Sequence, residues 1–172
     1  MTKKKIAIVA GTRPEVIKMA QVYHVLKTSD ILEPVFISTA QHRQMLDQAL
    51  RIFSIVPDFD MDIMQAGQTL TDLTARLLSA WKDYFSKSKP DAVLVQGDTT
   101  TVLATSIAAF YERIPIGHIE AGLRTYNFDA PFPEEMNRRL TDPISKWCFA
   151  PTKCSYDNLI REGVNPASCF IT

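Results

Sequence analysis

Polar and charged side chains follow four short apolar runs that are typical of parallel β-strands. Because the carboxyl ends of parallel strands lie at one edge of a sheet, where helix N-termini offer N–H groups, these side chains are expected to converge. The convergence would bring together arginines, carboxylates and several small hydroxyls, which suits anion binding and acid/base chemistry. The four segments are Gly11 to Glu15, Thr39 to Gln44, Gln96 to Thr101 and Glu120 to Arg124.

Each acidic residue has a structural interpretation beside the chemical one. Asp98 lies where it could cap the following helix. Its spacing is equally consistent with a cap and with a chemical role. Glu120 follows an apolar strand and precedes Ala and Gly rather than a helix, so capping does not explain it. Glu134 and Glu135 begin a helix, where acidic residues favour the dipole, although their place after a long loop leaves a functional role open. His118 lies inside an apolar run and is interpreted as a core histidine.

Two common nucleotide sites and metal chemistry are not supported by the motifs. Neither G-x-G-x-x-G nor G-x-x-x-x-G-K-[ST] occurs, which argues against a nicotinamide cofactor and a P-loop triphosphate site. A phosphate could still meet Arg13 and the N-terminus of the helix that it opens. Cys148, Cys154 and Cys169 fit neither a disulfide framework nor a C-x-x-C metal pair, so free buried thiols are expected. We therefore predict no metal and no organic cofactor.

Composition places the chain among ordinary globular domains. It has 172 residues, of which 46% are hydrophobic and 22% charged, enough for one domain with a sizeable core. Nineteen basic and nineteen acidic residues give a formal net charge of zero, so no global field draws the protein to nucleic acid or to an anionic membrane. No apolar stretch approaches the roughly 20 residues of a bilayer span, and no signal-peptide core follows Met1. A cytoplasmic location is expected.

Apolar runs alternate with segments of helical spacing, the pattern of repeated βαβ units. This predicts an α/β fold with a Rossmann-like doubly wound parallel sheet, and the helix 44–53 is expected to turn Met45, Ala49 and Ile52 inward. A long loop over 122–133 beside a strand end is more often functional than idle. Strands are predicted at 5–10, 35–38, 92–95, 116–119 and 147–150 and near 61–64 and 170–172, and helices at 14–28, 44–53, 69–88, 100–113, 134–140 and 152–162.

Seven short strings, taken in order, closely resemble the non-hydrolysing UDP-N-acetylglucosamine 2-epimerases of bacteria. The resemblance implies one half of a GT-B-like two-domain enzyme that is usually a homodimer. Residues 1–172 would be its amino-terminal domain, and the carboxy-terminal domain, with most UDP contacts and a catalytic histidine, would be absent, so this chain alone is expected to be inactive. The strings are GTRPE (11–15), IKMA (17–20), TAQHRQMLDQ (39–48), FSIVPD (53–58), QGDTTT (96–101), HIEAGLRT (118–125) and PFPEEMNRRL (131–140).

The chemistry implied by the resemblance explains the carboxylates. Such enzymes interconvert UDP-GlcNAc and UDP-ManNAc, for cell-surface polysaccharide precursors, by anti elimination of UDP to 2-acetamidoglucal and re-addition. The C2 proton is not acidified by a carbonyl, so the route needs a base, an acid on the opposite face and cations on the diphosphate. By matching position, Asp98, Glu120 and Glu134 would be the acid/base carboxylates, and Arg13 the diphosphate contact.

Two further assignments follow from matching positions and helix spacing. Arg138, a substrate-binding candidate, lies four residues beyond Glu134, where it could fix that carboxylate or form an ordinary surface pair. Regulated relatives bind a second UDP-GlcNAc through the TAQHRQ segment, which makes Gln41, His42 and Gln44 candidate effector contacts. Some regulated relatives carry an arginine where this chain has Gly67, so the cation of that site is missing here.

Two other function classes fit parts of the pattern. A non-catalytic nucleotide-sugar-binding or regulatory module would keep the sugar side of the cleft without turnover. Half of a GT-B glycosyltransferase would share the architecture, although the GTRPE and HIEAGLR strings argue against it.

Overall fold

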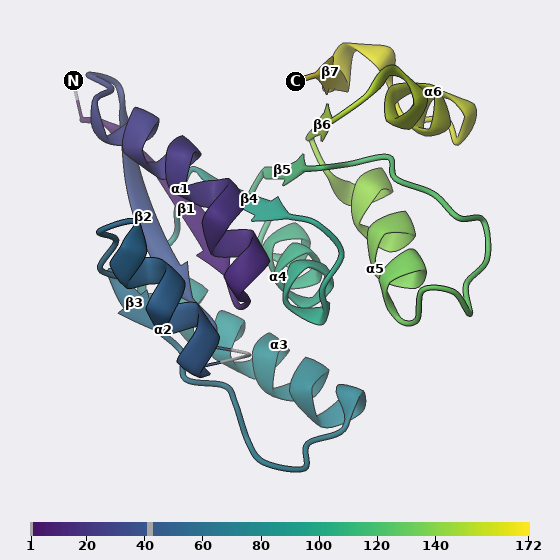
Figure 1. The fold of residues 1–172 in the computed structure, drawn as a ribbon. Coiled ribbons are helices and arrows are strands. Elements are labelled where there is room, and N and C mark those ends of the chain that lie inside the picture. Colours follow the sequence, from purple (N-terminus) through teal and green to yellow (C-terminus); the bar gives the residue numbers. More distant parts are fainter. Residues whose placement is uncertain (1, 41–42) are drawn as a thin grey trace.

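The computed structural model describes residues 2–40 and 43–172, and in this part of the chain seven parallel strands form one sheet. Their order is β3-β2-β1-β4-β5-β6-β7, which confirms the predicted doubly wound α/β fold (Figure 1). The strands are β1 (Lys4–Ala10), β2 (Leu32–Ser38), β3 (Phe59–Asp60), β4 (Ala92–Gln96), β5 (Ile116–Ile119), β6 (Trp147–Ala150) and β7 (Cys169–Ile171).

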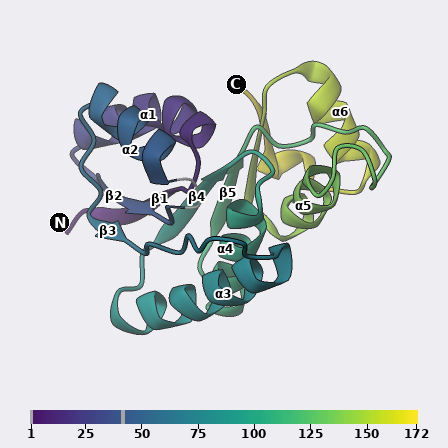
Figure 2. The same cartoon turned by 60° about the horizontal axis from the view of Figure 1, so that its bottom comes forward.

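Helices cover both faces of this sheet. In Figure 2, α1 and α2 lie above the strands β1 and β2, whereas α3 and α4 lie below the sheet. No helix among the described residues combines the length and the hydropathy that a bilayer crossing requires. The helices are α1 (Arg13–Lys27), α2 (Arg43–Ile52), α3 (Leu70–Lys87), α4 (Thr100–Tyr111), α5 (Glu134–Thr141) and α6 (Lys153–Arg161), with 3₁₀ turns η1 (Asp142–Ile144) and η2 (Pro166–Ser168).

The strand order creates a crevice between β1 and β4. These two strands pair in parallel, but the chain leaves β1 toward β2 on one side and leaves β4 toward β5 on the other. The connections therefore separate at this point, and the turns that follow the two strands flank an opening that helices do not fill. Ligands of open parallel sheets bind at such switch points.

Two of the three apolar clusters in the described part of the chain hold the central strands between helices. Strand residues alternate between the faces, so Ala7 and Val9 pack toward α3 and α4 while Ile8 and Ala10 pack toward α1 and α2. Trp81, which has no exposed surface, lies in the first core and stacks on Phe85. This two-sided burial explains why the central strands are apolar along their whole length.

The prediction for the inward face of α2 is wrong at two positions. Met45 is 51% exposed and Ile52 is 66% exposed, whereas the buried residues are Leu46, Ala49 and Leu50. Leu46 and Leu50 are one turn apart, with Ala49 beside them, so they form a compact apolar stripe against α1. The amphipathic face is therefore rotated from the predicted one.

The extended piece predicted at 61–64 is also displaced. The strand β3 is Phe59–Asp60, and it pairs with the end of β2 through Ile37 opposite Phe59 and Ser38 opposite Asp60. The Asp58 N–H donates to the Phe36 carbonyl at 2.9 Å, which starts the pairing directly after Pro57. Edge pairing with β2, which local sequence does not reveal, sets this register.

Gly122 is the tightest backbone approach in the region that follows β5. Its φ is +84°, and a Cβ placed there would lie 2.2 Å from the Ser155 carbonyl oxygen at the start of α6. Its amide donates to Asp142 and its carbonyl accepts from Asn158. Glycine is required here both by the left-handed backbone and by the contact with α6.

We predict that Gly122→Ala lowers the free energy of unfolding by about 3 kcal/mol or more, because a left-handed alanine and a backbone clash add. Gly163→Ala is the matched control, since Gly163 has φ +87° and open space around its Cβ position, so only about 1 kcal/mol is lost. Urea unfolding of both variants measures the difference. Equal losses would contradict the close approach of Gly122 to α6.

Candidate functional site

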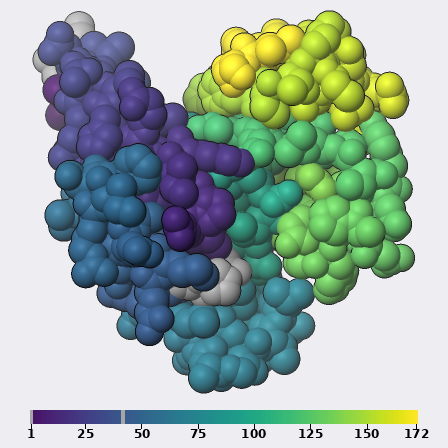
Figure 3. Space-filling view, viewed as in Figure 1, coloured from purple at the N-terminus to yellow at the C-terminus, as the bar shows by residue number. Residues whose placement is uncertain are grey.

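A small cavity lies at the carboxyl edge of β1, β4 and β5, where the sequence predicts the polar side chains to meet. Its volume is about 170 Å³. Figure 3 shows the hollow that contains this edge, between the purple surface of α1 and the green surface that includes α5. The lining residues are Thr12 before α1, Pro14, Glu15 and Lys18 in α1, Gln96 at the end of β4, Gly97, Asp98 and Thr99 in the turn after β4, and Glu120 after β5.

Glu120 projects into this cavity from a left-handed backbone. Its φ is +68°, a conformation that costs a non-glycine residue about 1 kcal/mol or more and is concentrated at functional sites. The carboxylate accepts hydrogen bonds from the ammonium of Lys18 and from the amide of Gln96. Lys18 was missed by sequence reasoning, because an exposed lysine on a helix gives no signal of its own.

Asp98 does not cap α4, so the structural interpretation of this residue is wrong. The cap is Thr99, whose hydroxyl accepts from the Val102 N–H at 3.2 Å. The Asp98 carbonyl accepts from the Asn137 side-chain amide at 2.8 Å, and its carboxylate lies 3.3 Å from the Arg138 guanidinium. Contacts with α5 thus hold Asp98 at the cavity, and its carboxylate does not cap α4.

The surroundings of Asp98 shift the pKa of its carboxyl group. Burial raises the pKa of Asp98 above its usual value, and although the Arg138 charge opposes this, the charges of Glu134 and Glu120 raise it further. This coupling places all three predicted acid/base carboxylates within one electrostatic neighbourhood. A half-buried carboxyl group with neighbours of like charge is typical of acid/base sites.

Arg138 pairs differently from either predicted arrangement. Its Nε donates to Glu135 at 2.9 Å and its Nη1 faces Asp98, so it does not fix Glu134. Glu135 is fully buried and also accepts from the Thr125 and Tyr126 N–H groups, both at 3.0 Å. These three donors outweigh burial and hold the pKa of Glu135 below its usual range. The pair anchors the 122–133 loop beside the cavity, while the Glu134 side chain remains half-buried.

The first turn of α1 contains a carboxylate that lies in a segment expected at this edge but was not among the predicted acid/base groups. Glu15 is buried and accepts from the Gly11 and Thr12 N–H groups at 2.6 and 2.7 Å and from the Thr99 hydroxyl at 2.6 Å. Burial raises its pKa in spite of these donors. The Gly11 and Thr12 amides, which precede α1, are therefore occupied by this carboxylate. Arg13 is exposed at the first position of α1.

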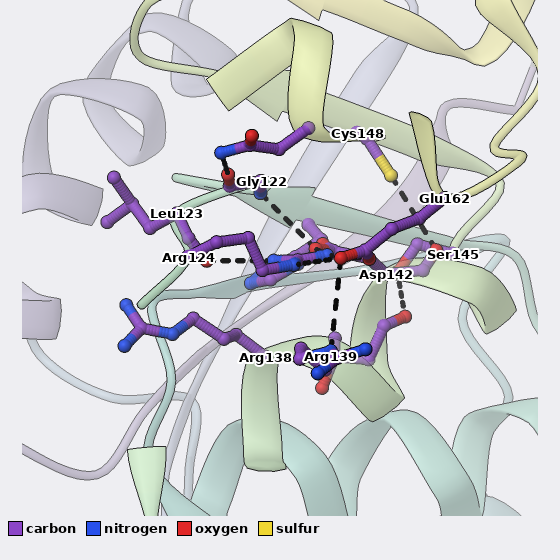
Figure 4. Close-up of polar contacts among 12 residues, drawn as sticks. Gly122, Leu123, Arg124, Arg138, Arg139, Asp142, Ser145, Cys148 and Glu162 are labelled. Atoms are coloured by element: carbon purple, nitrogen blue, oxygen red, sulfur yellow. Dashed lines mark hydrogen bonds and ion pairs between the residues drawn. The ribbon is translucent and has the colours of Figure 1, made fainter. Parts of the chain in front are cut away.

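Arg124, one of the arginines expected at this edge, does not point into the cavity. Its side chain is fully buried and bonds bidentately to Glu162 at 2.9 and 2.7 Å and to Asp142 at 2.6 Å (Figure 4). The other Asp142 oxygen faces His118 at 2.6 Å. His118 is fully buried, as predicted for a core histidine. The partners of Arg124 lie 18 and 38 residues away, too far for sequence spacing to reveal.

The remaining predictions concern α2 and the cysteines. Gln41 and His42 lie outside the described residues, and Gln44 is exposed on α2. Cys148 and Cys169 are free and buried, as expected, but Cys154 is exposed, because it lies on the solvent side of the first turn of α6. Burial raises the pKa of the Cys148 thiol above the usual range.

Comparison with known proteins agrees with the geometry. The family model described as UDP-N-acetylglucosamine 2-epimerase matches residues 24–172. The chain belongs to this family. It is 55% identical to the UDP-N-acetylglucosamine 2-epimerase of Escherichia coli K12 over 168 residues, which are 98% of this chain and 45% of that protein. The chain thus spans about half the length of the epimerase relatives that it matches.

Solved structures show the same relation. The crystal structure of the Neisseria meningitidis 2-epimerase bound to UDP-GlcNAc is 50% identical and superposes with a TM-score of 0.94, over 98% of this chain and 45% of that one. Acinetobacter baumannii MurG, at 15% identity and a TM-score of 0.69, matches 46% of its chain and is alike in fold alone. The epimerase fold of this chain is therefore that of one Rossmann-like half of a GT-B-like structure.

We predict that Asp98→Asn stabilises the fold at pH 7. The folded pKa of Asp98 is raised, so its ionisation in the folded state costs stability above that pKa, and the cost disappears below the unfolded value of about 3.9. The gain on substitution should therefore grow as pH rises from about 4 through the folded pKa of Asp98, and it should level off above that pKa. Urea unfolding across this range measures it, and a gain independent of pH would contradict the raised pKa.

Substitution of the buried Asp142 is expected to destabilise the fold, unlike substitution of Asp98. Because its carboxylate serves both His118 and Arg124, Asp142→Asn should lower the free energy of unfolding by about 3 kcal/mol. Glu112→Gln, which breaks only the exposed 3.5 Å pair with Lys89, should cost less than about 1 kcal/mol. Denaturant unfolding at pH 7 compares them, and similar losses would show that the buried cluster is not the stronger constraint.

Proposed function

We propose that this chain supplies the acid/base half of an active site that interconverts UDP-N-acetylglucosamine and UDP-N-acetylmannosamine. The observation that carries the proposal is that Asp98 and Glu120 line one cavity, with Lys18 and Arg138 paired to them, while the charge of Glu134 acts on Asp98. The matched relatives carry the name of this epimerase, and one is solved with UDP-GlcNAc bound.

The reaction suits the contrast between the carboxylates. Elimination of UDP across C1–C2 requires a base that removes the C2 proton, and re-addition requires an acid that returns a proton to the other face. The raised pKa of Asp98 favours its protonated form, while Glu120 accepts from Lys18 and Gln96 and is thereby aimed at the cavity. Glu134 is the third candidate, from the start of α5. Arg13, exposed at the start of α1 between the lining residues Thr12 and Pro14, is the proposed diphosphate contact.

The cavity is too small to enclose a whole nucleotide sugar. Its volume of about 170 Å³ is below the roughly 300–1,000 Å³ of pockets that enclose a whole small-molecule ligand. The chain also spans only about half of its relatives. We therefore propose that a second domain closes over the cleft and grips UDP, and that residues 1–172 alone do not turn over. Neither a metal nor an organic cofactor is part of the proposal.

Compartment and assembly follow as further parts of the proposal. We place the protein in the cytoplasm, because its three cysteines are free and a reducing compartment suits free thiols. We propose a homodimer for the complete enzyme. Phe110 and Tyr111, which are 53% and 77% exposed, border a surface hollow of about 510 Å³ that offers apolar area for such contacts.

A chimera tests the carboxylate assignments. This chain would replace the aligned 168 residues of the Escherichia coli relative. Asp98→Asn and Glu120→Gln should each lower kcat by about 10²-fold or more, because a group that moves a proton in the transition state is lost. Formation of UDP-ManNAc from UDP-GlcNAc is measured by proton NMR.

Glu112→Gln serves as the control, since its exposed pair with Lys89 is remote from the cavity, and it should leave kcat unchanged. Near-normal turnover of folded Glu120→Gln would contradict the assignment. Binding of UDP-GlcNAc by calorimetry without any turnover of the unsubstituted chimera would instead favour a non-catalytic sugar-binding module.

A further inference from the structure

His118 is buried between two hydrogen-bond acceptors. Its Nδ1 lies 2.6 Å from Asp142 Oδ1, and its Nε2 lies 2.7 Å from the carbonyl oxygen of Gly97. A neutral imidazole has one N–H and one lone pair, and a backbone carbonyl cannot donate. Nε2 must therefore carry a proton, and a second proton must lie between Nδ1 and Asp142.

The second proton belongs to the imidazole. The other oxygen of Asp142 accepts from the Arg124 guanidinium at 2.6 Å and from the Gly122 N–H at 3.2 Å, and both donors favour an ionised carboxylate. Imidazole is also the stronger base, with an ordinary pKa of about 6.5 against about 3.9 for an aspartate. Burial opposes the charge of His118, but the Asp142 carboxylate and the Gly97 carbonyl keep its pKa above the usual value.

This histidine contacts the residue that precedes Asp98. The Gly97 N–H donates to the Ile119 carbonyl at 3.0 Å, while the Gly97 carbonyl accepts from His118. On the other side, the Asp98 carbonyl accepts from Asn137. The peptide that carries Asp98 is thus fixed from β5 and from α5. The positive charge of His118 also lowers the pKa of Asp98, against the effect of burial.

We propose that His118 is a protonated positioning residue that holds the Gly97 carbonyl and thereby places Asp98, and that its positive charge favours the ionised form of Asp98. This inference rests on the proposed role of Asp98 as an acid/base group. His118 itself touches no substrate, because it is fully buried. The charged and titratable groups around it are Asp142 from η1, Arg124 from the 122–133 loop, Glu162 behind Arg124, Cys148 from β6 and Asp98 from the turn after β4.

The protonation state can be observed without any assay of activity. The chain has three histidines, so ¹⁵N-labelled protein gives few ring resonances, and the exposed His24 provides a reference. Comparison with His118→Asn assigns the His118 signals. At pH 7 both His118 nitrogens should resonate as protonated, each coupled to a solvent-protected proton. One unprotonated nitrogen at pH 7 would overturn the proposal.

Kinetics of the chimera test the link to Asp98. His118→Asn should lower kcat by up to about 10²-fold with little change in KM, because the reacting group is misplaced while the binding contacts remain. The limb of the pH profile that Asp98→Asn abolishes should move to higher pH, since a cation beside Asp98 is lost. His118→Gln, which can still reach the Gly97 carbonyl, should recover kcat in part and keep the displaced limb. His24→Asn should change nothing.

The outcomes separate this inference from the proposed function. Loss of kcat with an unmoved pH profile would make His118 purely structural and would overturn the inference, as would normal kinetics of a folded variant. An unsubstituted chimera without turnover would count against the proposed function, while the ring nitrogen signals would still decide the charge of His118. If neither variant folds, His24→Asn identifies the reference signals in the otherwise unsubstituted chain. A remaining ring with two solvent-protected protons then supports the proposal, and the absence of such a ring overturns it.

Discussion

The constraint on which the site depends is the repulsion among three carboxylates at one sheet edge. Like charges in a partly buried crevice cannot all ionise freely, and here Glu120 and Glu134 raise the pKa of Asp98. Two cations offset this repulsion: Lys18 of α1 pairs with Glu120, and Arg138 of α5 pairs with Asp98. The sheet order makes this possible, because β1 and β4 are neighbours whose helices leave on opposite faces.

A second layer of buried charge supports the first. Arg124 and Asp142 have no exposed side-chain surface, and together with Glu162 they join the 122–133 loop, η1 and the end of α6. Breaking one partner of such a buried group costs far more than breaking an exposed pair. The cluster therefore stabilises the position of β5. This strand contains His118 and is followed directly by Glu120.

Much of this arrangement could be predicted from the sequence, for definite physical reasons. The strands over 116–119 and 147–150 are confirmed residue for residue, because apolar runs bounded by turn residues are local signals. The meeting of Asp98 and Glu120 follows from the strand-edge rule. Pairings across the fold were not predictable. Helix spacing alone could not show that Arg138 chooses Glu135 and Asp98, and nothing near Arg124 revealed that it is buried.

The most direct test of the central claim is proton NMR of UDP-GlcNAc in D2O, with the chimera and with this chain alone. If the chain supplies the groups that move the C2 proton, the chimera should place deuterium at C2 and form UDP-ManNAc, while this chain alone should not. Silence of a folded chimera that still binds UDP-GlcNAc would contradict the claim that these carboxylates perform the proton transfer. Exchange by residues 1–172 alone would contradict the claim that a second domain is needed.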